Sequence, residues 1–352
     1  MVVRKGEMAL RRYVSLAVTA LLLLAVVIVG TAYAVRAKHP PESHFQAEIT
    51  VYTTIPQEHA AALAAAYEKQ EHVRVHFVNL TADDLLKKLQ SAKKPEAALV
   101  LADSATLRTA SAAGAFQPYI SESGDQVAEE FRQDDGYWTG VWYDPVVFCY
   151  NQDYLKTLPR IPDNWKSLSD LPEARIGVTD FLASDAAANL FCSMLTEFGD
   201  ARTFGIWRNI HPHVVQYARY LSNPVRQAGM GEVDVAVAVE SETLRYLHDG
   251  YPLRIVYPTD GTSFILTGTG IVKGISDRQR VEAEAFADWL LTDDAQLALQ
   301  SNNFYLLPTN PGTMAYRRFP GKNLQLFTQI PDFTPQQKHD ALDRWVKQVR
   351  FE

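Results

Sequence analysis

The chain of 352 residues has only two cysteines and none of the short motifs that mark the common classes of active site. It contains no G-x-S-x-G, no H-E-x-x-H, no G-x-x-x-x-G-K-[ST] and no Cys–His spacing typical of a metal site. These absences count against a hydrolase, a metalloprotease and a nucleotide-triphosphate enzyme. We therefore expect a binding protein rather than an enzyme, with no cofactor and no resident metal.

The two cysteines lie in apolar surroundings. Cys149 is part of the run VVFCY, and Cys192 belongs to the helical stretch NLFCSML. Both contexts are typical of a protein core, so we predict two buried free thiols. A disulfide between them remains the alternative, because an exported protein permits one.

Positive charge is scarce outside the N-terminus. Residues 1–38 hold six of the 34 Lys and Arg and one of the 41 Asp and Glu, which leaves 28 basic and 40 acidic residues and a net charge of −12 beyond them. Such a body is a poor partner for nucleic acid or for an anionic membrane surface. An anionic ligand would have to bind in a local pocket.

An uncharged apolar run occupies residues 14–36 up to Arg36, and four basic residues precede it: Arg4, Lys5, Arg11 and Arg12. This arrangement predicts that the rest of the chain is exported. The run is long enough to span a bilayer, while Ala32-Tyr33-Ala34 fits a signal-peptidase site, so a cleaved signal peptide and a retained anchor both remain open. No cysteine near its end could carry a lipid.

The exported body begins with alternating strands and helices. Apolar strands are predicted at 47–54, 73–80 and 96–103, with a helix after Pro56 and another that Thr81 caps. Ser104 is placed to cap the helix after the third strand. Strands that alternate with helices predict an α/β fold with a mostly parallel sheet.

Two long extended stretches, 137–151 and 253–274, interrupt this alternation, and the first contains Asp144-Pro145. We interpret them as crossings between two domains, which a body of about 310 residues also favours. Two links suit hinge closure around a ligand. The expected organisation is a signal peptide or anchor at 1–38, a linker at 39–46, lobe 1 at 47–143 and 258–310, lobe 2 at 144–257 and a C-terminal helical segment at 311–352.

Hydroxyl side chains recur where predicted strands lead into helices. Ligands of open parallel sheets bind at such strand ends, and helix N-termini favour anions there. Plain N-capping explains each hydroxyl taken alone. The candidates are Thr53, Thr54, Ser104, Ser184, Ser222 and Ser241, and Trp142 or Tyr143 is the aromatic residue that we expect at a cleft, with core packing as the alternative.

Six segments, taken in order, resemble the extracellular solute-binding proteins of bacterial ABC transporters, in particular the ferric-iron-type group that includes binders of phosphonates and sugar phosphates. The segments are ITVYTTIPQEHAAALAAAYEKQ, TGVWYDPVVFCYN, GEVDVAVAVES, IVYPTDGTSFILTGTGIVKG, AFADWLLTDDAQ and YLLPTNPG. The resemblance implies a type II periplasmic-binding-protein fold, with two α/β lobes joined by two crossing segments and a ligand in the cleft.

The chain departs from both patterns in this group. Where iron carriers have a histidine it has Pro56, and where they have tandem tyrosines it has Ser241 and Glu242. Similarity to the phosphonate and sugar-phosphate binders implies an anionic head near Thr53, Thr54, Ser184, Ser222 and Thr262. Asp185, beside Ser184, would repel a phosphate unless it points away or a cation pairs with it, which leaves room for an amine-bearing ligand.

Three functions follow as hypotheses. The first is a monomeric extracytoplasmic protein that captures a small polar, anionic solute and delivers it to an ABC permease, with ferric iron as the alternative cargo. The second is a membrane-anchored sensor that partners a two-component histidine kinase. The third, supported only by scattered acids such as Glu240, is an exported enzyme. Closure around a ligand is the output in the first two.

Overall fold

The computed structural model describes residues 45–91, 94–319, 324–328 and 333–351. The chain divides after Gln46, and Ala47–Glu352 forms the compact unit described below. The predicted export segment at 14–36 and the linker at 39–46 fall on residues outside these ranges, apart from the last two of the linker. Among the described helices, none combines the length and the apolar character that a bilayer crossing requires.

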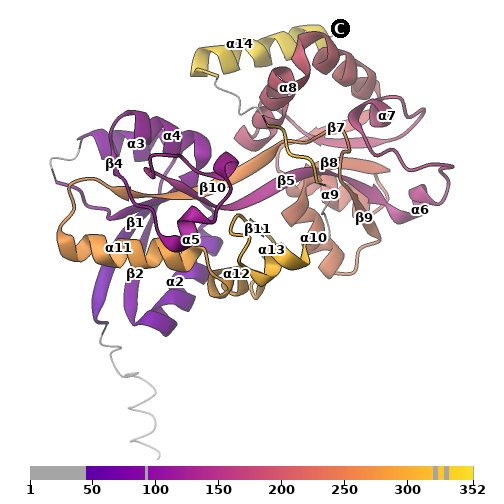
Figure 1. Cartoon of the computed structure of the whole chain (residues 1–352). Coiled ribbons are helices and arrows are strands. Elements are labelled where there is room, and N and C mark those ends of the chain that lie inside the picture. The colour runs from indigo at the N-terminus through magenta and orange to yellow at the C-terminus, as the bar shows by residue number, and fades with distance from the viewer. Residues whose placement is uncertain (1–44, 92–93, 320–323, 329–332, 352) are drawn as a thin grey trace, which may run out of the picture. The chain divides into compact units, whose positions relative to one another are not determined.

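The described strands form one mixed sheet (Figure 1). Its order is β2 (Val73–Asn79), β1 (Ala47–Thr53), β3 (Leu99–Asp103), β10 (Phe264–Val272), β5 (Thr139–Asn151), β8 (Val235–Val239), β6 (Ile176–Thr179) and β7 (Val214–Ala218). Three short strands pair beside this path: β4 (Phe116–Gln117) with β10, and β9 (Leu253–Val256) and β11 (Leu307–Pro308) with β5.

Each end of the sheet is parallel and its middle is antiparallel. β1 pairs in parallel with β2 and β3, and β6 pairs in parallel with β7 and β8. β10 is antiparallel to β3 and β5, and β5 is antiparallel to β8. The predicted parallel strands are therefore confirmed, and each of these antiparallel pairs contains β5 or β10, which come from the two predicted crossing stretches.

Strand β5 continues without a break through Asp144-Pro145, the point at which a crossing between two domains was predicted. Its first part pairs with β10 and β11, and its second part pairs with β8 and β9. Pro145 lies opposite Phe264, and the chain then continues with a hydrogen bond from the Val146 N–H to the Ser263 carbonyl. One strand thus belongs to both halves of the sheet.

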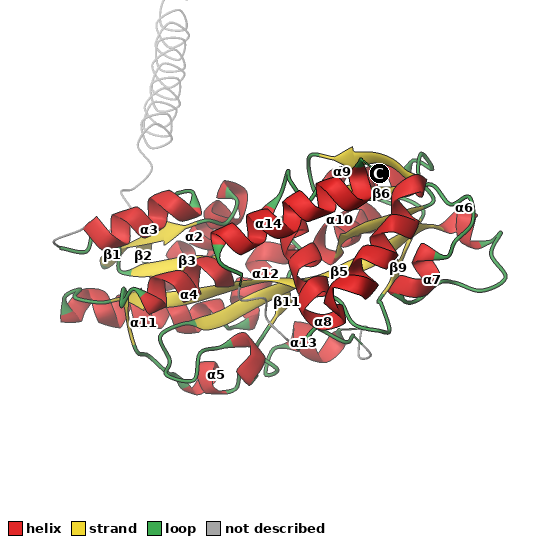
Figure 2. Cartoon of the chain, turned by 90° about the horizontal axis from the view of Figure 1, so that it is seen from above, coloured by secondary structure: helices red, strands yellow, loops and turns green. Residues whose placement is uncertain are grey.

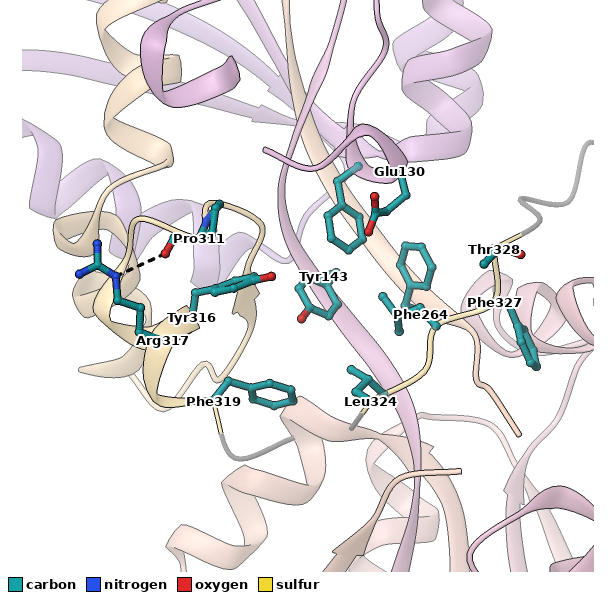
Figure 3. Close-up of a pocket in the computed structure, with 12 residues that line it drawn as sticks. Glu130, Tyr143, Phe264, Pro311, Tyr316, Arg317, Phe319, Leu324, Phe327 and Thr328 are labelled. Atoms are coloured by element: carbon teal, nitrogen blue, oxygen red, sulfur yellow. Dashed lines mark hydrogen bonds between the residues drawn. The ribbon is translucent and has the colours of Figure 1, made fainter. Parts of the chain in front are cut away.

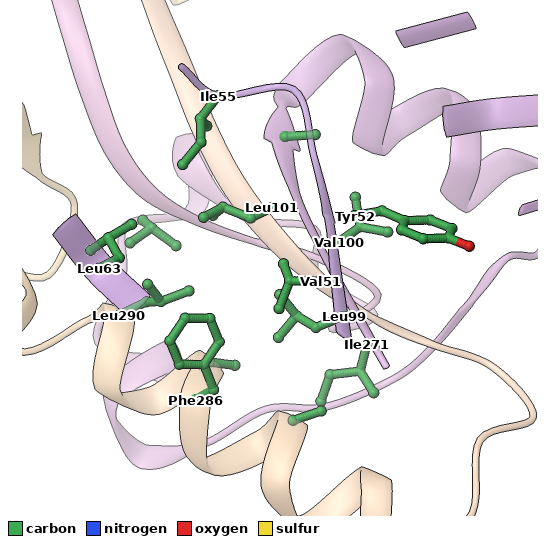
Figure 4. Close-up of a cluster of buried hydrophobic side chains, with 14 of the residues drawn as sticks. Val51, Tyr52, Ile55, Leu63, Leu99, Val100, Leu101, Ile271, Phe286 and Leu290 are labelled. Atoms are coloured by element: carbon green, nitrogen blue, oxygen red, sulfur yellow. The ribbon is translucent and has the colours of Figure 1, made fainter. Parts of the chain in front are cut away.

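Two large hydrophobic cores lie on the two halves. The first contains Val51, Leu99, Ile271 and Phe286, and Figure 4 shows these side chains gathered between the strands and the neighbouring helix. The second is rich in aromatic rings, among them Phe148, Trp165, Phe181, Phe191, Trp207 and Trp345. At roughly 25 cal/mol per Å² of apolar area removed from water, these large buried side chains provide most of the stabilisation of the fold.

Helices cover the sheet (Figure 2). Their bounds are α2 (Gln57–Glu71), α3 (Ala82–Ser91), α4 (Ser104–Ala112), α5 (Glu122–Asp125), η1 (Glu129–Phe131), α6 (Gln152–Leu155), α7 (Trp165–Ser169), α8 (Asp185–Ile210), η2 (His211–His213), α9 (Ser222–Gly229), α10 (Glu240–His248), α11 (Asp277–Leu290), α12 (Asp293–Gln300), α13 (Met314–Arg318), α14 (Pro335–Trp345) and η3 (Val346–Arg350).

Helix ends test several local predictions. The Thr81 hydroxyl accepts the Asp84 N–H, as expected for a cap. The cap of α4 was predicted wrongly: Asp103 accepts the Thr106 N–H, and Ser104 is the first residue of the helix. A carboxylate is the stronger acceptor at a helix N-terminus because it also meets the positive end of the helix dipole. Helix α8 was expected to end near Phe198; Gly199, with φ of +75°, does interrupt it, but helix resumes and continues to Ile210.

The prediction for the cysteines is confirmed. Cys149 and Cys192 are both free and buried. Burial raises the pKa of Cys149 to about 12 and that of Cys192 to about 11, so neither thiol is ionised at neutral pH.

Candidate functional site

A cavity of about 740 Å³ lies beside the middle of β5 (Figure 3). We call it the aromatic pocket, because six of its twelve lining residues carry aromatic rings beside apolar and polar neighbours. The lining consists of Glu130, Phe131, Tyr143, Phe264, Pro311, Tyr316, Arg317, Phe319, Leu324, Leu326, Phe327 and Thr328, with Phe327 as a sixth ring that belongs to the second core.

One wall of the pocket is a set of three packed rings from three elements. Phe131 of η1 stacks on Tyr143 of β5, with ring centroids 4.9 Å apart and planes at 18°. Phe264, the first residue of β10, packs edge-on against Phe131 at 5.6 Å. Aromatic pairs in these geometries contribute more than their buried area alone. The wall is therefore fixed in place before any ligand arrives.

Helix α13 supplies the facing wall. Thr313 caps this helix by accepting the Tyr316 N–H, and Figure 3 shows the hydroxyl end of Tyr316 pointing toward Tyr143. The Arg317 guanidinium donates to the carbonyls of Pro311 and Gly312, so this residue contributes the aliphatic part of its side chain to the wall. The positive charge is thus directed at the backbone of its own turn, away from the pocket interior.

Acidic groups dominate the electrostatics around Tyr143. Burial raises the pKa of its phenol above the ordinary value, and the neighbouring Tyr316, Glu240 and Glu130 raise it further. Glu130 lies on the pocket lining and is exposed. A negative charge near a phenol disfavours the phenolate, so Tyr143 is a hydrogen-bond donor here.

Two buried carboxyl groups lie behind this wall. Both oxygens of Asp144 accept hydrogen bonds from Ser241, from its N–H at 2.9 Å and from its hydroxyl at 2.6 Å, and burial raises the pKa of Asp144 to about 7. Glu240 is only 2% exposed, and burial raises its pKa to about 8. Glu240 accepts from the Tyr257 hydroxyl at 2.5 Å through Oε1, whereas its Oε2 is buried without a hydrogen-bond partner.

The buried acids connect to the pocket through aromatic side chains. The ring of Tyr257 lies 5.8 Å from that of Phe319, which lines the pocket, and the charge of Glu240 contributes to the raised pKa of Tyr143. Among the described residues, no group of three or more His, Cys, Asp or Glu side chains could hold a metal ion. The site therefore combines aromatic faces and phenol donors with acids.

The predicted site residues lie outside the lining of the aromatic pocket, and several of their hydroxyls bond to backbone. Thr53 and Thr262 are fully buried and donate to the carbonyls of Leu101 and Val146. Thr54 shares a longer contact with Asp103.

Three of the predicted residues lie at helix starts. Ser104, Ser184 and Ser222 are half-buried at the starts of α4, α8 and α9, and the side chains of Ser184 and Ser222 make no capping hydrogen bond. Ser241 meets Asp144, and Trp142 is buried in the first core.

None of these eight residues is part of the described lining of the aromatic pocket. Trp142 precedes the lining residue Tyr143 on β5, and Thr262 lies two positions before the lining residue Phe264. The two aromatic residues expected at a cleft both belong to the first core, and only Tyr143 also lines the pocket. Tyr143 and Trp142 are neighbours on a strand, so their side chains point to opposite faces.

Sequence reasoning missed most of the pocket because its residues come from segments without a periodic pattern. Tyr316, Phe319, Leu324 and Phe327 follow the YLLPTNPG segment, in a stretch that we assigned only to a C-terminal helical region. The sequence feature that could have identified these lining residues is the repeated occurrence of aromatic residues in a stretch between two polar turns. The Thr262 N–H donates to Gln325, and Phe327 donates back to Thr262, which ties this stretch to the second crossing.

Asp185, expected to repel an anion unless paired, is paired. Lys338 of α14 contacts it at 2.7 Å, and Arg350 contacts Asp180 of the same loop at 2.6 Å. Trp345 packs against Phe181 with ring centroids 4.9 Å apart. The C-terminal helix therefore covers the loop between β6 and α8, where the resemblance implied an anion contact.

A protein-family model described as bacterial extracellular solute-binding protein matches residues 62–315. The chain belongs to this family. Iron uptake protein A1 of Synechocystis sp. is 24% identical over 316 residues, which make up 83% of this chain and 86% of that protein. An uncharacterized protein of Haemophilus influenzae is 26% identical over 251 residues, 68% of this chain and 71% of the relative.

Solved structures show the same fold. The periplasmic binding protein AfuA of Actinobacillus pleuropneumoniae, with fructose-6-phosphate bound, has a TM-score of 0.66 at 21% identity, over 87% of this chain and 100% of AfuA. A ferric binding protein of Bordetella has a TM-score of 0.70 at 19% identity, over 86% of this chain and 99% of that protein. The expected type II periplasmic-binding-protein fold is confirmed, and so is the expected family.

Proposed function

We propose that the protein captures a small solute in the aromatic pocket, outside the cytoplasm, and delivers it to an ABC permease. The observation that supports this most directly is the composition of the pocket walls. They come from both crossing strands, β5 and β10, and from the segments 311–319 and 324–328. A solute that contacts all of them would stabilise one arrangement of the two halves, which a permease can recognise.

The lining favours an organic solute with an apolar or planar body. Pockets for such solutes are mostly apolar, with a few polar groups that fix orientation. Here Phe131, Phe264 and Phe319 supply the faces, while the phenols of Tyr143 and Tyr316 supply hydrogen bonds. The expected anionic solute has weaker support, because the hydroxyls of Thr53 and Thr262 are engaged with backbone carbonyls.

A ferric ion, free or chelated, is the second candidate cargo. Phenol and carboxyl oxygens are hard donors that suit it, and the pocket offers Tyr143, Tyr316 and Glu130. Relatives named for iron uptake or ferric binding add to this support. The tandem tyrosines expected of an iron carrier are replaced by Ser241 and Glu242, and this places iron second.

A thermal-shift screen of the full chain in detergent tests capture directly. The panel holds glucose 6-phosphate, 2-aminoethylphosphonate, ferric citrate, choline and spermidine. A ligand present at 100 times its Kd raises the free energy of unfolding by about 2.7 kcal/mol, so binding appears as a higher Tm. We expect a rise with one chemical class that disappears in Tyr143→Ala. A rise unaffected by that substitution would place the site outside the aromatic pocket.

The partner in the membrane is a separate question. A permease predicts that the loaded protein stimulates ATP hydrolysis by a transporter encoded beside it. The sensor alternative predicts a histidine kinase in the same position. Stimulation of neither by the loaded protein would count against both partners.

A further inference from the structure

The short segment 324–328 contacts both halves of the sheet. Leu324 and Leu326 are half-buried and pack against the first core. Phe327, the next residue, is 5% exposed and belongs to the second core. Figure 3 shows its ring directed away from Tyr143. Neighbouring side chains of one segment therefore hold on to two different cores.

The backbone of this segment is tied to the crossing strands at one residue, Thr262. The Thr262 N–H donates to the Gln325 carbonyl at 2.9 Å, and the Phe327 N–H donates back to the Thr262 carbonyl at 2.8 Å. Thr262 and Leu326 form a parallel bridge. The Thr262 hydroxyl donates to the carbonyl of Val146 on β5 at 2.8 Å. The segment is thus attached at the point where the chain passes from one half to the other.

Phe327 is closely packed in the second half. Its ring meets that of Phe198 on α8 edge-on, with centroids 5.1 Å apart. On its other contact, a Cβ added to Gly261 would lie only 2.9 Å from two atoms of the Phe327 ring, so the ring packs directly on the glycine backbone. Close-packed contacts of this kind are lost over a small displacement. Phe327 therefore cannot shift by a small amount and keep its contacts.

The chain on either side of the segment belongs to different halves. Before it, the Met314 N–H of α13 donates to Asp293 of α12, a helix that packs in the first core. After it, Trp345 of α14 is fully buried in the second core. The chain thus passes between the halves a third time, in addition to β5 and the stretch 253–274.

We propose that residues 324–328 form a strap that holds the two halves of the sheet in one arrangement. A rotation of the halves about the crossing strands moves one core relative to the other. The strap is seated in both cores, so it must release either Phe327 or the two leucines before such a rotation. The strands β5 and β10 can bend without breaking, whereas the packing of Phe327 is lost at once. This role does not depend on which solute the pocket takes.

Distance measurement by double electron–electron resonance tests the strap in the full chain without any solute. Spin labels at Lys69→Cys on α2 and Lys166→Cys on α7 report on the two halves, and both positions are exposed. The native thiols of Cys149 and Cys192 are buried and stay unlabelled. We expect one distance in the chain with an intact strap. In Phe327→Ala we expect a second distance, adopted by at least about a tenth of the molecules.

Phe204→Ala is the matched control, because Phe204 is also buried in the second core, where it packs on Phe191. This variant loses a ring of the same size and should keep the single distance. The double variant Leu324→Ala/Leu326→Ala loosens the strap at half-buried positions, and it decides the matter where circular dichroism shows Phe327→Ala unfolded. One unchanged distance in the folded strap variants, or an equal second distance in Phe204→Ala, would overturn the proposal.

Discussion

The carboxylate of Asp144, in the middle of β5, caps helix α10 by accepting both the N–H and the hydroxyl of Ser241. The cap comes from a strand 97 positions away in the sequence rather than from the residue before the helix. It ties the strand shared by both halves of the sheet to the helix that begins with Glu240. Changes at this contact should therefore affect stability and binding together.

Removing this cap should destabilise the protein. Asp144→Ala leaves the first N–H groups of α10 without an acceptor in a buried position, which costs about 1 to 3 kcal/mol of the free energy of unfolding. Urea denaturation measures the change. Asp170→Ala is a suitable control, because Asp170 pairs only with Lys166 on the surface and should cost less than about 1 kcal/mol. Equal midpoints for the two variants would contradict the capping role.

The protonation of Glu240 should appear in the pH dependence of stability. Its pKa is raised from 4.5 to about 8 in the folded protein, so the folded state holds a proton that the unfolded state releases. The stability that this proton confers is fully present below pH 4.5 and is lost as the pH rises through about 8. Urea unfolding of Glu240→Gln should therefore weaken less between pH 5.5 and pH 8.5 than that of the wild type. Parallel pH profiles would show that Glu240 is ionised throughout.

The phenols of the pocket should contribute to affinity and little to stability. Tyr143→Phe and Tyr316→Phe each remove one hydroxyl from the lining and keep the ring, so each should weaken binding of the solute found in the screen by about 0.5 to 1.5 kcal/mol. Calorimetric titration measures the loss. Tyr305→Phe, outside the lining, serves as the control. Full affinity in the double variant would exclude the phenols as ligand contacts.

Substitution of Thr53 and Ser222 distinguishes the anion site that the resemblance implies from the aromatic pocket. The resemblance implies that alanine at both positions weakens binding of an anion by roughly 2 to 4 kcal/mol. The buried Thr53 hydroxyl instead donates to Leu101 and accepts from Ile55, so its removal should lower the free energy of unfolding by about 1 to 3 kcal/mol. We expect a less stable double variant with unchanged affinity. A loss of affinity at constant stability would favour the anion site.

The parts of the fold that the sequence predicted are those with a local signal. Apolar runs predicted β1 and β3, alternating apolar positions predicted β2, helical spacing predicted α2, and apolar surroundings predicted the free thiols. Two long extended stretches interrupted the alternation of strands and helices, and they form β5 and the pair β9 and β10. In each case a few neighbouring residues carried the information.

The pocket was not predictable in this way, because its walls meet only after the chain has returned from the second half of the sheet. Hydroxyls at strand ends predicted anion contacts, which stay a prediction; the Thr53 and Thr262 hydroxyls donate to backbone carbonyls distant in sequence. In the sequence Glu240 is one of several scattered acids, and the structure buries it in contact with the Tyr257 hydroxyl. No local pattern distinguishes a buried acid from an exposed one.

The strand shared by both halves of the sheet has a consequence for how the chain folds. The first core lacks β10 until residues 264–272 have emerged, so β3 has an unpaired edge while the whole second half is being made. Open strand edges in slowly completed sheets invite pairing with other chains. Because the contacts that close this edge join residues far apart in sequence, folding is expected to be slow and to finish late. Newly exported molecules therefore pass through an interval in which aggregation competes with completion of the sheet.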